Sequence, residues 1–322
     1  MKIVVLERGT VGFDVSVDCL KELGEVDFYD NSSVDEIAGR VADAEIVIAN
    51  KSPLNEKTIG EAKKIRLICE FATGYDNIDL TYCRANGISV CNVSNYSTAS
   101  VMQHTFALAL ALSEHLSDYE SFVRDGSYTA QGRFTHYEPV FRELEGKTWG
   151  ILGMGNIGRR VARAAEAFGC KVIWAGTSGS RREEGYPQVE LSELLRQSDI
   201  LSLHCPLNEK THHIIDADAF SLMKSDAILI NVARGGVVDS AALADAIRSS
   251  RIAGAALDVM EGEPLPKDNP LYGLLDDKRL LITPHMAWAS LEARERVVGE
   301  TYENIRAFLR GEERNCVLSV SS

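Results

Sequence analysis

The chain has 322 residues, 45% of them hydrophobic, and this length exceeds the size at which a single hydrophobic core usually stops growing, so two domains are expected. A formal net charge of −13 and a pI near 5.1 exclude a broad surface for nucleic-acid phosphates or anionic lipid. One or two local cations could still hold a small anionic substrate.

The first hundred residues alternate short β-branched runs with helix-length amphipathic segments. This alternation predicts βαβ units and a parallel sheet, which makes this part an α/β domain of its own. The expected strands are 2–6, 26–29, 45–49, 66–70 and 88–92. The opening apolar run ends at Glu7, which is too early for the core of a signal peptide, and no later stretch approaches a membrane span.

The seven cysteines are odd in number, scattered and never arranged as C-x-x-C. Neither a disulfide framework nor a metal site is therefore expected. Several of the cysteines fall in apolar runs, and we interpret them as reduced core thiols. The sequence thus predicts a cytoplasmic protein without membrane or nucleic-acid partners.

A long apolar segment runs from Ser97 to about Leu116 and predicts one helix, with Ser97, Thr98 or Ser100 as its N-cap. Polar residues interrupt this segment too often for a membrane helix. Residues 117–147 are polar and aromatic and lack a clear period. They are expected to form an exposed arm or an interface.

A second alternating series begins at Thr148 and matches a doubly wound sheet. The expected strands are 148–152, 171–175, 199–203, 227–231, 253–259 and 279–283. An amphipathic helix is then predicted over 290–311, ending at Gly311 and long enough to return to the first domain.

The stretch "GMGNIG", residues 153–158, is a G-x-G-x-x-G pattern that follows a predicted strand and opens a predicted helix. Gly153 permits the turn, Gly155 lets a pyrophosphate approach the backbone, and Gly158 lets helix and strand pack closely. The free amides near Asn156 and Ile157 would face the phosphates.

A dinucleotide site for NAD usually has an acid about 20 residues further on, at the end of the second strand. This chain has Gly176 there, followed by Thr177, Ser178, Gly179, Ser180, Arg181 and Arg182. Losing a carboxylate and gaining hydroxyls and cations favours the 2′-phosphate of NADP(H) over NAD(H). The alternative is a solvated loop whose arginines balance Glu183 and Glu184.

Three later motifs, each following a predicted strand, carry residues suited to hydride chemistry: "NVARGG" (231–236), "LDVMEGEP" (257–264) and "TPHMAW" (283–288). His285 is the expected general acid for the oxygen of a ketone. Glu263 could fix the imidazole tautomer, and the planar fork of Arg234 could hold a carboxylate and the keto oxygen. Together they indicate reduction of a 2-keto acid.

Each of these residues also has a structural interpretation. An arginine beside glycines is often a surface ion pair, a glutamate before proline is often a loop acid, and a single histidine is more often structural than catalytic. Their shared placement after strands of one nucleotide-binding sheet favours the functional interpretation. The remaining histidines lack such a setting and are expected to be structural: His104, His115, His136, His204, His212 and His213.

Over essentially its full length the chain resembles the D-isomer specific 2-hydroxyacid dehydrogenases. The motifs "GMGNIG", "LHCPLNEKTHHIID" (203–216), "NVARGG", "ALDVMEGEP" and "TPHMAW" follow one another at that family's spacing. Within it, "ATGYDNID" (72–79), "NYSTASVMQHTFAL" (95–108) and Trp288 are most similar to the glycerate dehydrogenase or hydroxypyruvate (glyoxylate) reductase branch.

The resemblance implies an α/β fold of two doubly wound parallel-sheet domains. A Rossmann nucleotide-binding domain, residues 101–288, would be inserted into a flavodoxin-like substrate domain, residues 1–100 and 289–322. It also implies a homodimer built partly from residues 101–145. The substrate carboxylate would lie at the amides of Thr73 and Gly74, with Lys51 as a second cation.

The catalytic residues expected on these grounds are Arg234, Glu263 and His285, and by the same resemblance Asp258 would meet the nicotinamide carboxamide. The expected cofactor-binding residues are Gly153, Met154, Gly155, Asn156, Ile157, Gly158, Gly176, Thr177, Ser178, Arg181, Cys205, Pro206, Thr211, Val232, Ala233 and Asp258. The expected substrate-binding residues are Lys51, Thr73, Gly74, Arg234, His285 and Trp288.

Three departures narrow the expected reaction. Gly176 replaces the acid usual in NAD-dependent members, and Glu263 stands where the formate dehydrogenase branch has glutamine. No regulatory domain follows residue 322 and loop 71–76 carries no cation, which disfavours a phosphorylated substrate. The expected reaction is reduction of hydroxypyruvate or glyoxylate. A bulkier, phenylpyruvate-type acid and a non-catalytic, nucleotide-sensing corepressor remain as alternatives.

Overall fold

The computed structural model describes residues 1–178 and 184–320, and it divides the chain into two compact units. Unit 1 consists of Met1–Ser97 and Ala289–Ser322, and unit 2 consists of Thr98–Trp288. Each unit is built around one six-stranded sheet, so the predicted α/β fold with two parallel sheets is confirmed. No helix among the described residues has the length and apolarity needed to cross a bilayer.

The sheet of unit 1 has the strand order β2-β1-β3-β4-β5-β12. The first five strands run parallel in a flavodoxin-like order. Their bounds are β1 Lys2–Val5, β2 Glu25–Phe28, β3 Ile46–Ala49, β4 Leu67–Glu70 and β5 Ser89–Cys91. Short β12, Cys316–Leu318, pairs antiparallel with β5 at the edge. The five parallel strands match the predicted runs to within one residue, whereas β12 has no counterpart among the predictions.

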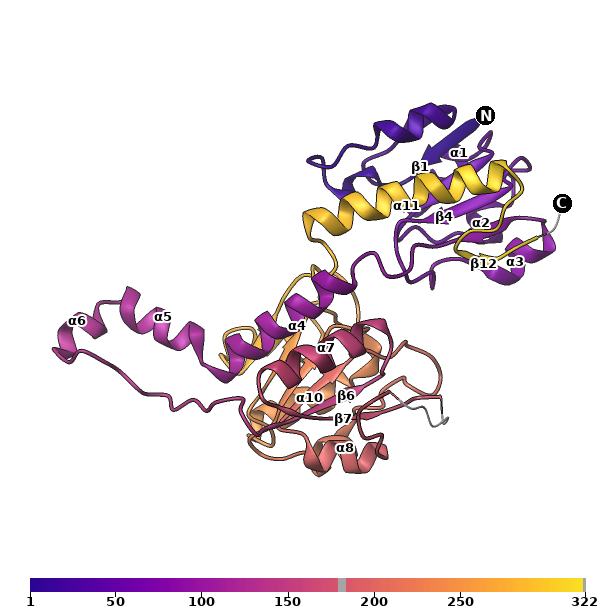
Figure 1. Ribbon diagram of the computed structural model, residues 1–322. Coiled ribbons are helices and arrows are strands. Elements are labelled where there is room, and N and C mark those ends of the chain that lie inside the picture. Colours follow the sequence, from indigo (N-terminus) through magenta and orange to yellow (C-terminus); the bar gives the residue numbers. More distant parts are fainter. Residues whose placement is uncertain (179–183, 321–322) are drawn as a thin grey trace. The chain divides into compact units, whose positions relative to one another are not determined.

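Helices cover both faces of this sheet because the strands are apolar on both sides (Figure 1). The shorter elements are α1 Val34–Arg40, α2 Glu56–Ile59, α3 Leu80–Ala85 and the 3₁₀ turns Arg8–Val11 and Asp18–Leu23. The predicted last helix is α11, Leu291–Leu309, which begins at the N-cap Ser290. It packs across β4, so the end of the chain belongs to the same unit as its beginning.

The sheet of unit 2 has the strand order β7-β6-β8-β9-β10-β11, and all its pairings are parallel. The strands are β6 Thr148–Leu152, β7 Lys171–Ala175, β8 Ile200–Leu203, β9 Ile228–Asn231, β10 Gly254–Leu257 and β11 Leu280–Ile282. All six were predicted. Gln188 adds a single parallel bridge outside β7, at the position of one further strand in a Rossmann sheet.

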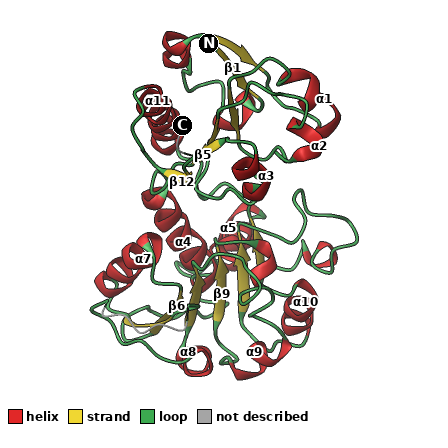
Figure 2. Ribbon diagram, turned by 90° about the vertical axis from the view of Figure 1, so that its right-hand side faces the viewer, coloured by secondary structure: helices red, strands yellow, loops and turns green. Residues whose placement is uncertain are grey.

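Two apolar clusters sandwich this sheet, and Figure 2 shows α7 and α10 on opposite faces. On one face lie α4 Thr98–Ser113 and α7 Asn156–Ala167, and on the other lie α8 Leu191–Gln197, α9 Ala217–Leu222 and α10 Ser240–Arg248. Two 3₁₀ turns, Gly235–Val237 and Tyr272–Leu274, complete the unit. The long apolar helix predicted from Ser97 is therefore α4, a core helix of unit 2.

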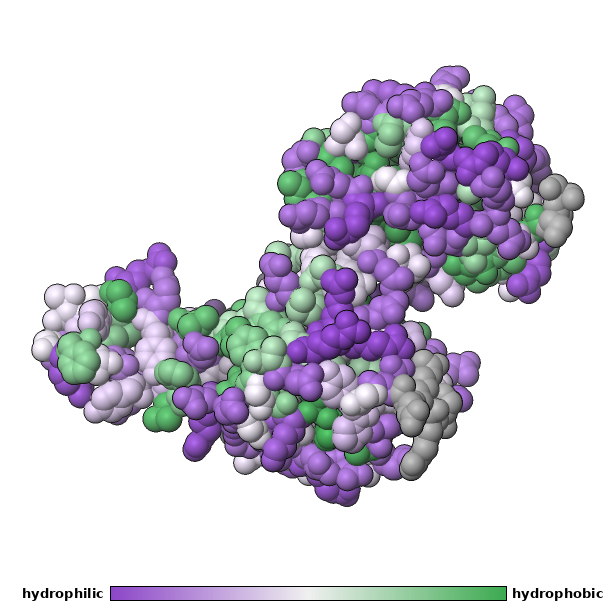
Figure 3. All heavy atoms as spheres, in the orientation of Figure 1, coloured by the Kyte–Doolittle hydropathy of each residue, from purple (hydrophilic) through white to green (hydrophobic). Residues whose placement is uncertain are grey.

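Residues 116–141 form the arm of unit 2, which projects from the end of α4 (Figure 1). It contains two helices that the sequence pattern did not predict, α5 Leu116–Arg124 and α6 Ser127–Gln131. Neither helix has a buried residue. Leu116, Tyr119 and Val123 nevertheless recur at helical spacing along α5, so the sequence did contain a helical pattern that was overlooked among the polar residues of this segment. Several apolar side chains of the arm are exposed, including Phe134 and Val140. Figure 3 shows hydrophobic atoms in green on the surface of the arm.

Candidate active site

The glycine motif forms the turn between β6 and α7. Gly153 has a φ of +100°, and a side chain there would collide with the backbone of His204 and Cys205. A Cβ on Gly158 would lie 2.3 Å from the carbonyl oxygen of Gly153. Both positions therefore require glycine for packing, Gly153 because the loop after β8 lies against it and Gly158 because the helix lies against the turn.

Gly155 differs from its two neighbours because a Cβ there would meet no atom within 4 Å. It is the N-cap of α7 and, as a glycine, it supplies no side-chain cap to this helix end. The first amides of a helix have no acceptor within the helix, and together with the open backbone at Gly155 they suit an anionic group such as a pyrophosphate. Met154, Asn156 and Ile157 complete this turn, so the residues present fit a dinucleotide.

The end of β7 lacks a carboxylate, since Ala175 is followed by the exposed Gly176 and then by Thr177 and Ser178. Arg181, with Gly179, Ser180, Arg182 and Glu183, lies outside the described residues. Glu184 binds the guanidinium of Arg159 on α7, with 2.8 Å between Oε1 and an Nη atom. One of the two acids that could balance the loop arginines therefore has a partner on the helix.

The other predicted cofactor residues follow β8 and β9 at the same edge of the sheet. Cys205 and Thr211 are buried, and the Thr211 hydroxyl donates to the carbonyl of Pro206 at 2.7 Å, which closes the loop between them. Val232 and Ala233 follow β9 and are at most 9% exposed. These residues form the backbone wall next to the glycine turn.

Arg234 lies three residues beyond β9, at the start of the turn Gly235–Val237. Asn231 holds this segment in place: its side chain donates to the carbonyl of Arg234 at 2.9 Å and accepts from the amide of Ala233 at 3.0 Å. Gly235 packs directly on the backbone of Met260, where a Cβ would overlap the carbonyl carbon. The half-buried Arg234 side chain is therefore carried on a rigid segment.

His285 and Glu263 are in direct contact, with 2.6 Å between Nδ1 and Oε2. The other carboxylate oxygen of Glu263 accepts from the amide of Met260 at 3.1 Å. The side chains are 23% and 30% exposed, so the pair is open to solvent and to a ligand. Glu263 thus binds Nδ1 of the imidazole, which leaves Nε2 for a substrate. This is the arrangement of a general acid and the carboxylate that orients it.

The backbone at His285 is left-handed, with a φ of 53°, which is uncommon for a residue other than glycine. Two hydrogen bonds hold it there, from its amide to the carbonyls of Asp258 at 2.8 Å and Thr283 at 3.0 Å. A strained backbone maintained by its surroundings is frequent at functional sites. Arg234, Asp258 and His285 thus follow the neighbouring strands β9, β10 and β11.

Asp258 is 1% exposed, and its carboxylate holds the loop that carries His285. One oxygen accepts from the Thr283 hydroxyl at 2.6 Å and the Met286 amide at 2.8 Å, and the other accepts from the Ala287 amide at 2.8 Å. Burial acts to raise the pKa of Asp258, but hydrogen bonds from His104, Thr283 and the two amides outweigh it and lower the pKa. The predicted contact of Asp258 with the nicotinamide would compete with these bonds.

His104 joins this network, although the sequence suggested only a structural role for it. Its Nε2 lies 3.0 Å from the Thr283 hydroxyl and 3.5 Å from Oδ1 of Asp258. Helix α4 also supports the loop through Ser100, which donates to the carbonyl of Ala287 at 2.6 Å. Trp288 packs against the cluster beneath α4. Nothing local in the sequence links these residues, which lie almost 180 positions apart.

A second histidine–carboxylate pair lies beside the turn Gly235–Val237, where the His213 amide donates to the carbonyl of Gly236 at 2.8 Å. His213 Nε2 lies 2.6 Å from Glu261, whose other oxygen accepts from the Ser240 hydroxyl at 2.6 Å. His212 stacks on His213, and His212, His213 and Glu261 are a group of potential metal ligands. Stacked rings cannot both direct a lone pair at one ion without moving. We therefore interpret the pair as a clamp between two loops.

The predicted residues of unit 1 lie at the carboxyl edge of its own sheet. Glu7 accepts from the amides of Asn50 at 2.7 Å and Lys51 at 3.1 Å. The exposed ammonium of Lys51 forms no ion pair or hydrogen bond with the described residues. Thr73 is anchored by its hydroxyl to the carbonyl of Val93 at 2.8 Å, and the amides of Thr73 and Gly74 donate to no acceptor in the described chain.

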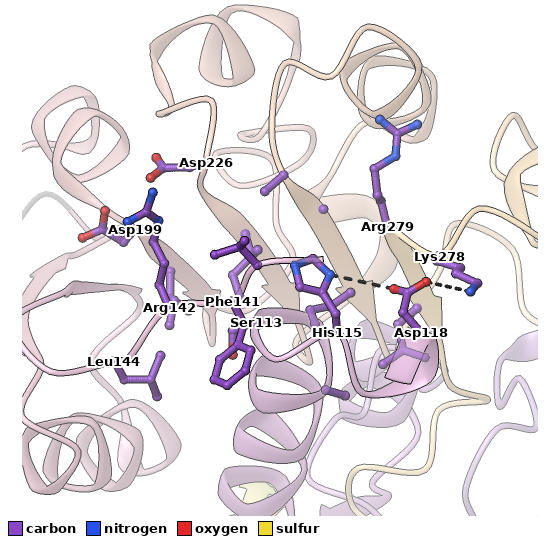
Figure 4. A pocket seen from close by; sticks show the side chains of 18 of the residues that line it. Ser113, His115, Asp118, Phe141, Arg142, Leu144, Asp199, Asp226, Lys278 and Arg279 are labelled. Atoms are coloured by element: carbon purple, nitrogen blue, oxygen red, sulfur yellow. Dashed lines mark hydrogen bonds and ion pairs between the residues drawn. The ribbon is translucent and has the colours of Figure 1, made fainter. Parts of the chain in front are cut away.

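A cavity of about 280 Å³ lies at the opposite edge of the unit 2 sheet, among residues at the starts of β8, β9, β10 and β11. Figure 4 shows Asp118 between His115 and Lys278, with Phe141 and Arg142 nearby. Ligands of open α/β sheets bind beyond the carboxyl ends of the strands. This cavity is therefore distinct from the candidate active site.

Residues 106–287 match the family model described as D-isomer specific 2-hydroxyacid dehydrogenase, NAD binding domain. The chain is 36% identical to the hydroxypyruvate reductase of Blautia hydrogenotrophica, over 98% of this chain and 99% of that protein. It is also 36% identical to the glycerate dehydrogenase of Methylorubrum extorquens, over 98% of each.

Two solved structures have the same fold over nearly their full length. One is D-lactate dehydrogenase from Aquifex aeolicus complexed with NAD and lactic acid, with a TM-score of 0.84, 32% identity and coverage of 97% of this chain and 96% of that chain. The other is an acyclic imino acid reductase in complex with NADPH and D-Arg, with a TM-score of 0.88, 33% identity and coverage of 99% and 100%.

Proposed function

The chain belongs to the D-isomer specific 2-hydroxyacid dehydrogenase family, an oxidoreductase family that uses a nicotinamide cofactor, and from this premise we propose that it reduces hydroxypyruvate or glyoxylate with NADPH. The observation that carries the proposal is the 2.6 Å contact between His285 and Glu263, in loops that follow adjacent strands of the nucleotide-binding sheet. Relatives named hydroxypyruvate reductase and glycerate dehydrogenase support this choice of substrate.

In the proposed reaction the residues of unit 2 manage the charge that develops on the keto oxygen. The Gly153–Gly158 turn would hold the pyrophosphate of the dinucleotide, and the reduced nicotinamide would supply the hydride. His285 donates the proton from Nε2 to the oxygen, which completes the hydroxyl group, and Glu263 stabilises the charged imidazole before the transfer. Arg234 binds the keto oxygen and the adjacent carboxylate through its planar guanidinium.

The residues of unit 1 are proposed to bind the substrate carboxylate. The amides of Thr73 and Gly74 have no protein acceptor among the described residues, and two free N–H groups in one loop suit an anion. Lys51 supplies the positive charge. Loop 71–76 offers no further cation for a phosphate, which favours a small unphosphorylated 2-keto acid.

NADPH is proposed over NADH because β7 ends without a carboxylate. An acid at that position would bind the two ribose hydroxyls of NAD and repel a 2′-phosphate. Gly176, Thr177 and Ser178 provide no negative charge. Arg181 is proposed as the cation for the phosphate on sequence grounds.

The test is a panel of hydroxypyruvate, glyoxylate, pyruvate and phenylpyruvate, each assayed with NADPH and NADH by absorbance. We expect the highest kcat/KM with hydroxypyruvate or glyoxylate and NADPH. A preference for phenylpyruvate would replace the proposed substrate by a bulkier one, and a clear preference for NADH would overturn the cofactor assignment. Binding of NADPH without turnover of any acid would indicate a nucleotide sensor.

The arm of unit 2 is proposed to form a homodimer interface. Phe134 is 91% exposed and Val140 71%, and exposed apolar side chains in such density are typical of surfaces that a partner covers. Light scattering is expected to give twice the chain mass of 35.3 kDa, and a monomer would contradict the proposal. All seven cysteines are free thiols, which supports the further proposal of a cytoplasmic location.

A further inference from the structure

Glu70, the last residue of β4, is a carboxylic acid that is 0% exposed. Its Oε2 accepts one long hydrogen bond, 3.4 Å from Nδ2 of Asn77, and its Oε1 has no hydrogen-bond partner in the described chain. An isolated buried carboxylate is costly, whereas the protonated acid loses far less on leaving water. The geometry therefore favours the neutral form.

The charged groups around Glu70 do not provide a counterion. Glu7, beyond β1, and Asp76, in the loop beyond β4, both disfavour a second negative charge, and Lys51, beyond β3, attracts one without forming an ion pair. Burial, the largest effect, raises the pKa of Glu70 to about 8. Glu70 thus carries its proton at neutral pH and loses it under mildly alkaline conditions.

Asn77 connects Glu70 to both loops of the proposed carboxylate site. The same Nδ2 that reaches Glu70 donates to the carbonyl of Ser52 at 2.9 Å, and the Asn77 carbonyl accepts from the Leu54 amide at 2.9 Å. Asn77 therefore ties the segment after Lys51 to the loop that carries Thr73. An ionised Glu70 would draw the Asn77 amide away from Ser52, because a charged acceptor forms the stronger hydrogen bond.

The new charge would also act on the substrate directly. Lys51 is the proposed cation for the substrate carboxylate, and its backbone already lies over the carboxylate of Glu7. A second negative charge nearby would attract the Lys51 ammonium inward and repel the incoming anion. Both effects weaken binding and neither touches the reacting carbonyl.

We propose that Glu70 is a positioning residue for the substrate carboxylate, whose proton keeps the Lys51 and Thr73 loops competent and whose ionisation weakens binding of the 2-keto acid. This inference rests on the proposed function. It predicts that KM for hydroxypyruvate rises about tenfold between pH 7 and pH 9.5, the size expected for one added charge at intermediate distance. The inference concerns KM, and it makes no demand on how kcat changes with pH.

The test compares wild-type enzyme with E70Q, which keeps the shape and cannot ionise, and with E61Q, which removes a carboxylate from an exposed position of the same unit. KM and kcat are measured from pH 6.5 to 9.5. We expect the rise in KM for wild type and E61Q, and a flat KM for E70Q. A rise in E70Q equal to that of wild type would overturn the inference while the reductase function stood.

Thermal unfolding over the same pH range provides a readout that needs no substrate. A carboxyl group whose pKa is higher in the folded state than in the unfolded state stabilises the fold less as pH rises toward the folded pKa. Wild type should therefore lose Tm relative to E70Q between pH 6.5 and about 8, and the difference should level off above that pH. Parallel curves would overturn the inference, whereas absence of turnover with every 2-keto acid would overturn the proposed function itself.

Discussion

The carboxyl edges of the two sheets have the same architecture and different chemistry. In unit 2, the loops beyond β9, β10 and β11 present Arg234, Glu263 and His285, charged side chains that are partly exposed. In unit 1, the corresponding edge presents free backbone amides and one lysine above two buried acids, Glu7 and Glu70. The two units therefore share a sheet edge at which loops can bind ligands, and the residues directly after each strand determine what that edge binds or catalyses.

The largest effect is expected at the unit 2 edge, for His285→Ala. Loss of a general acid should lower kcat by ~10²–10⁴-fold, because no other group would protonate the keto oxygen. Stopped-flow or steady-state turnover measures the change, and NADPH binding followed by fluorescence serves as the control for folding. Near-normal turnover of this variant would contradict the assignment of the general acid to the unit 2 edge.

Arg234→Lys is expected to lower kcat/KM by about 100-fold. Lysine keeps the charge but cannot hold a keto oxygen and a carboxylate through a planar fork. The matched control is Arg248→Lys, an exposed arginine at the end of α10, which should be neutral. Equal values for R234K and wild type would show that charge alone suffices at this position.

Gly176→Asp tests the cofactor end of the same edge. A carboxylate at the end of β7 should shift the NADPH to NADH ratio of kcat/KM toward NADH by roughly tenfold or more, because it repels the 2′-phosphate and binds the free ribose hydroxyls. An unchanged ratio would mean that residues elsewhere select the cofactor.

Lys51→Ala, at the unit 1 edge, should produce the smallest change. We expect KM to rise about tenfold with kcat nearly constant, because a partly exposed cation contributes modest binding free energy and takes no part in the chemical step. The wild-type KM should in turn rise with salt more steeply than that of K51A. A loss confined to kcat would mean that Lys51 acts in the chemical step, and would contradict the assignment of binding to unit 1 and catalysis to unit 2.

Local pattern was enough to predict the parallel strands, α4, α7 and α11. It failed to predict an element whose formation depends on residues far away in the chain. β12 is three residues long and exists because β5 offers it an edge. The spacing of hydrophobic residues does not indicate which distant strand a short segment pairs with.

The candidate site shows the same limit. His285 and Glu263 could be named from their motifs because both sit in short loops directly after strands. The support from His104 could not, since it reaches Thr283 and Asp258 from a helix far away in the chain. Glu70 was likewise hidden, because a charged residue at the end of a strand gives no sign in sequence that it is buried.

The insertion of unit 2 into unit 1 has a consequence for biosynthesis. All residues of unit 2 have been made once Trp288 leaves the ribosome, whereas the sheet of unit 1 waits for β12 at Cys316–Leu318. At about 5–20 residues per second, translation of the inserted segment leaves β5 as an uncovered edge for on the order of ten to forty seconds. We therefore expect unit 2 of the nascent chain to fold before unit 1. The chain should depend most on chaperones while β5 is still an uncovered edge.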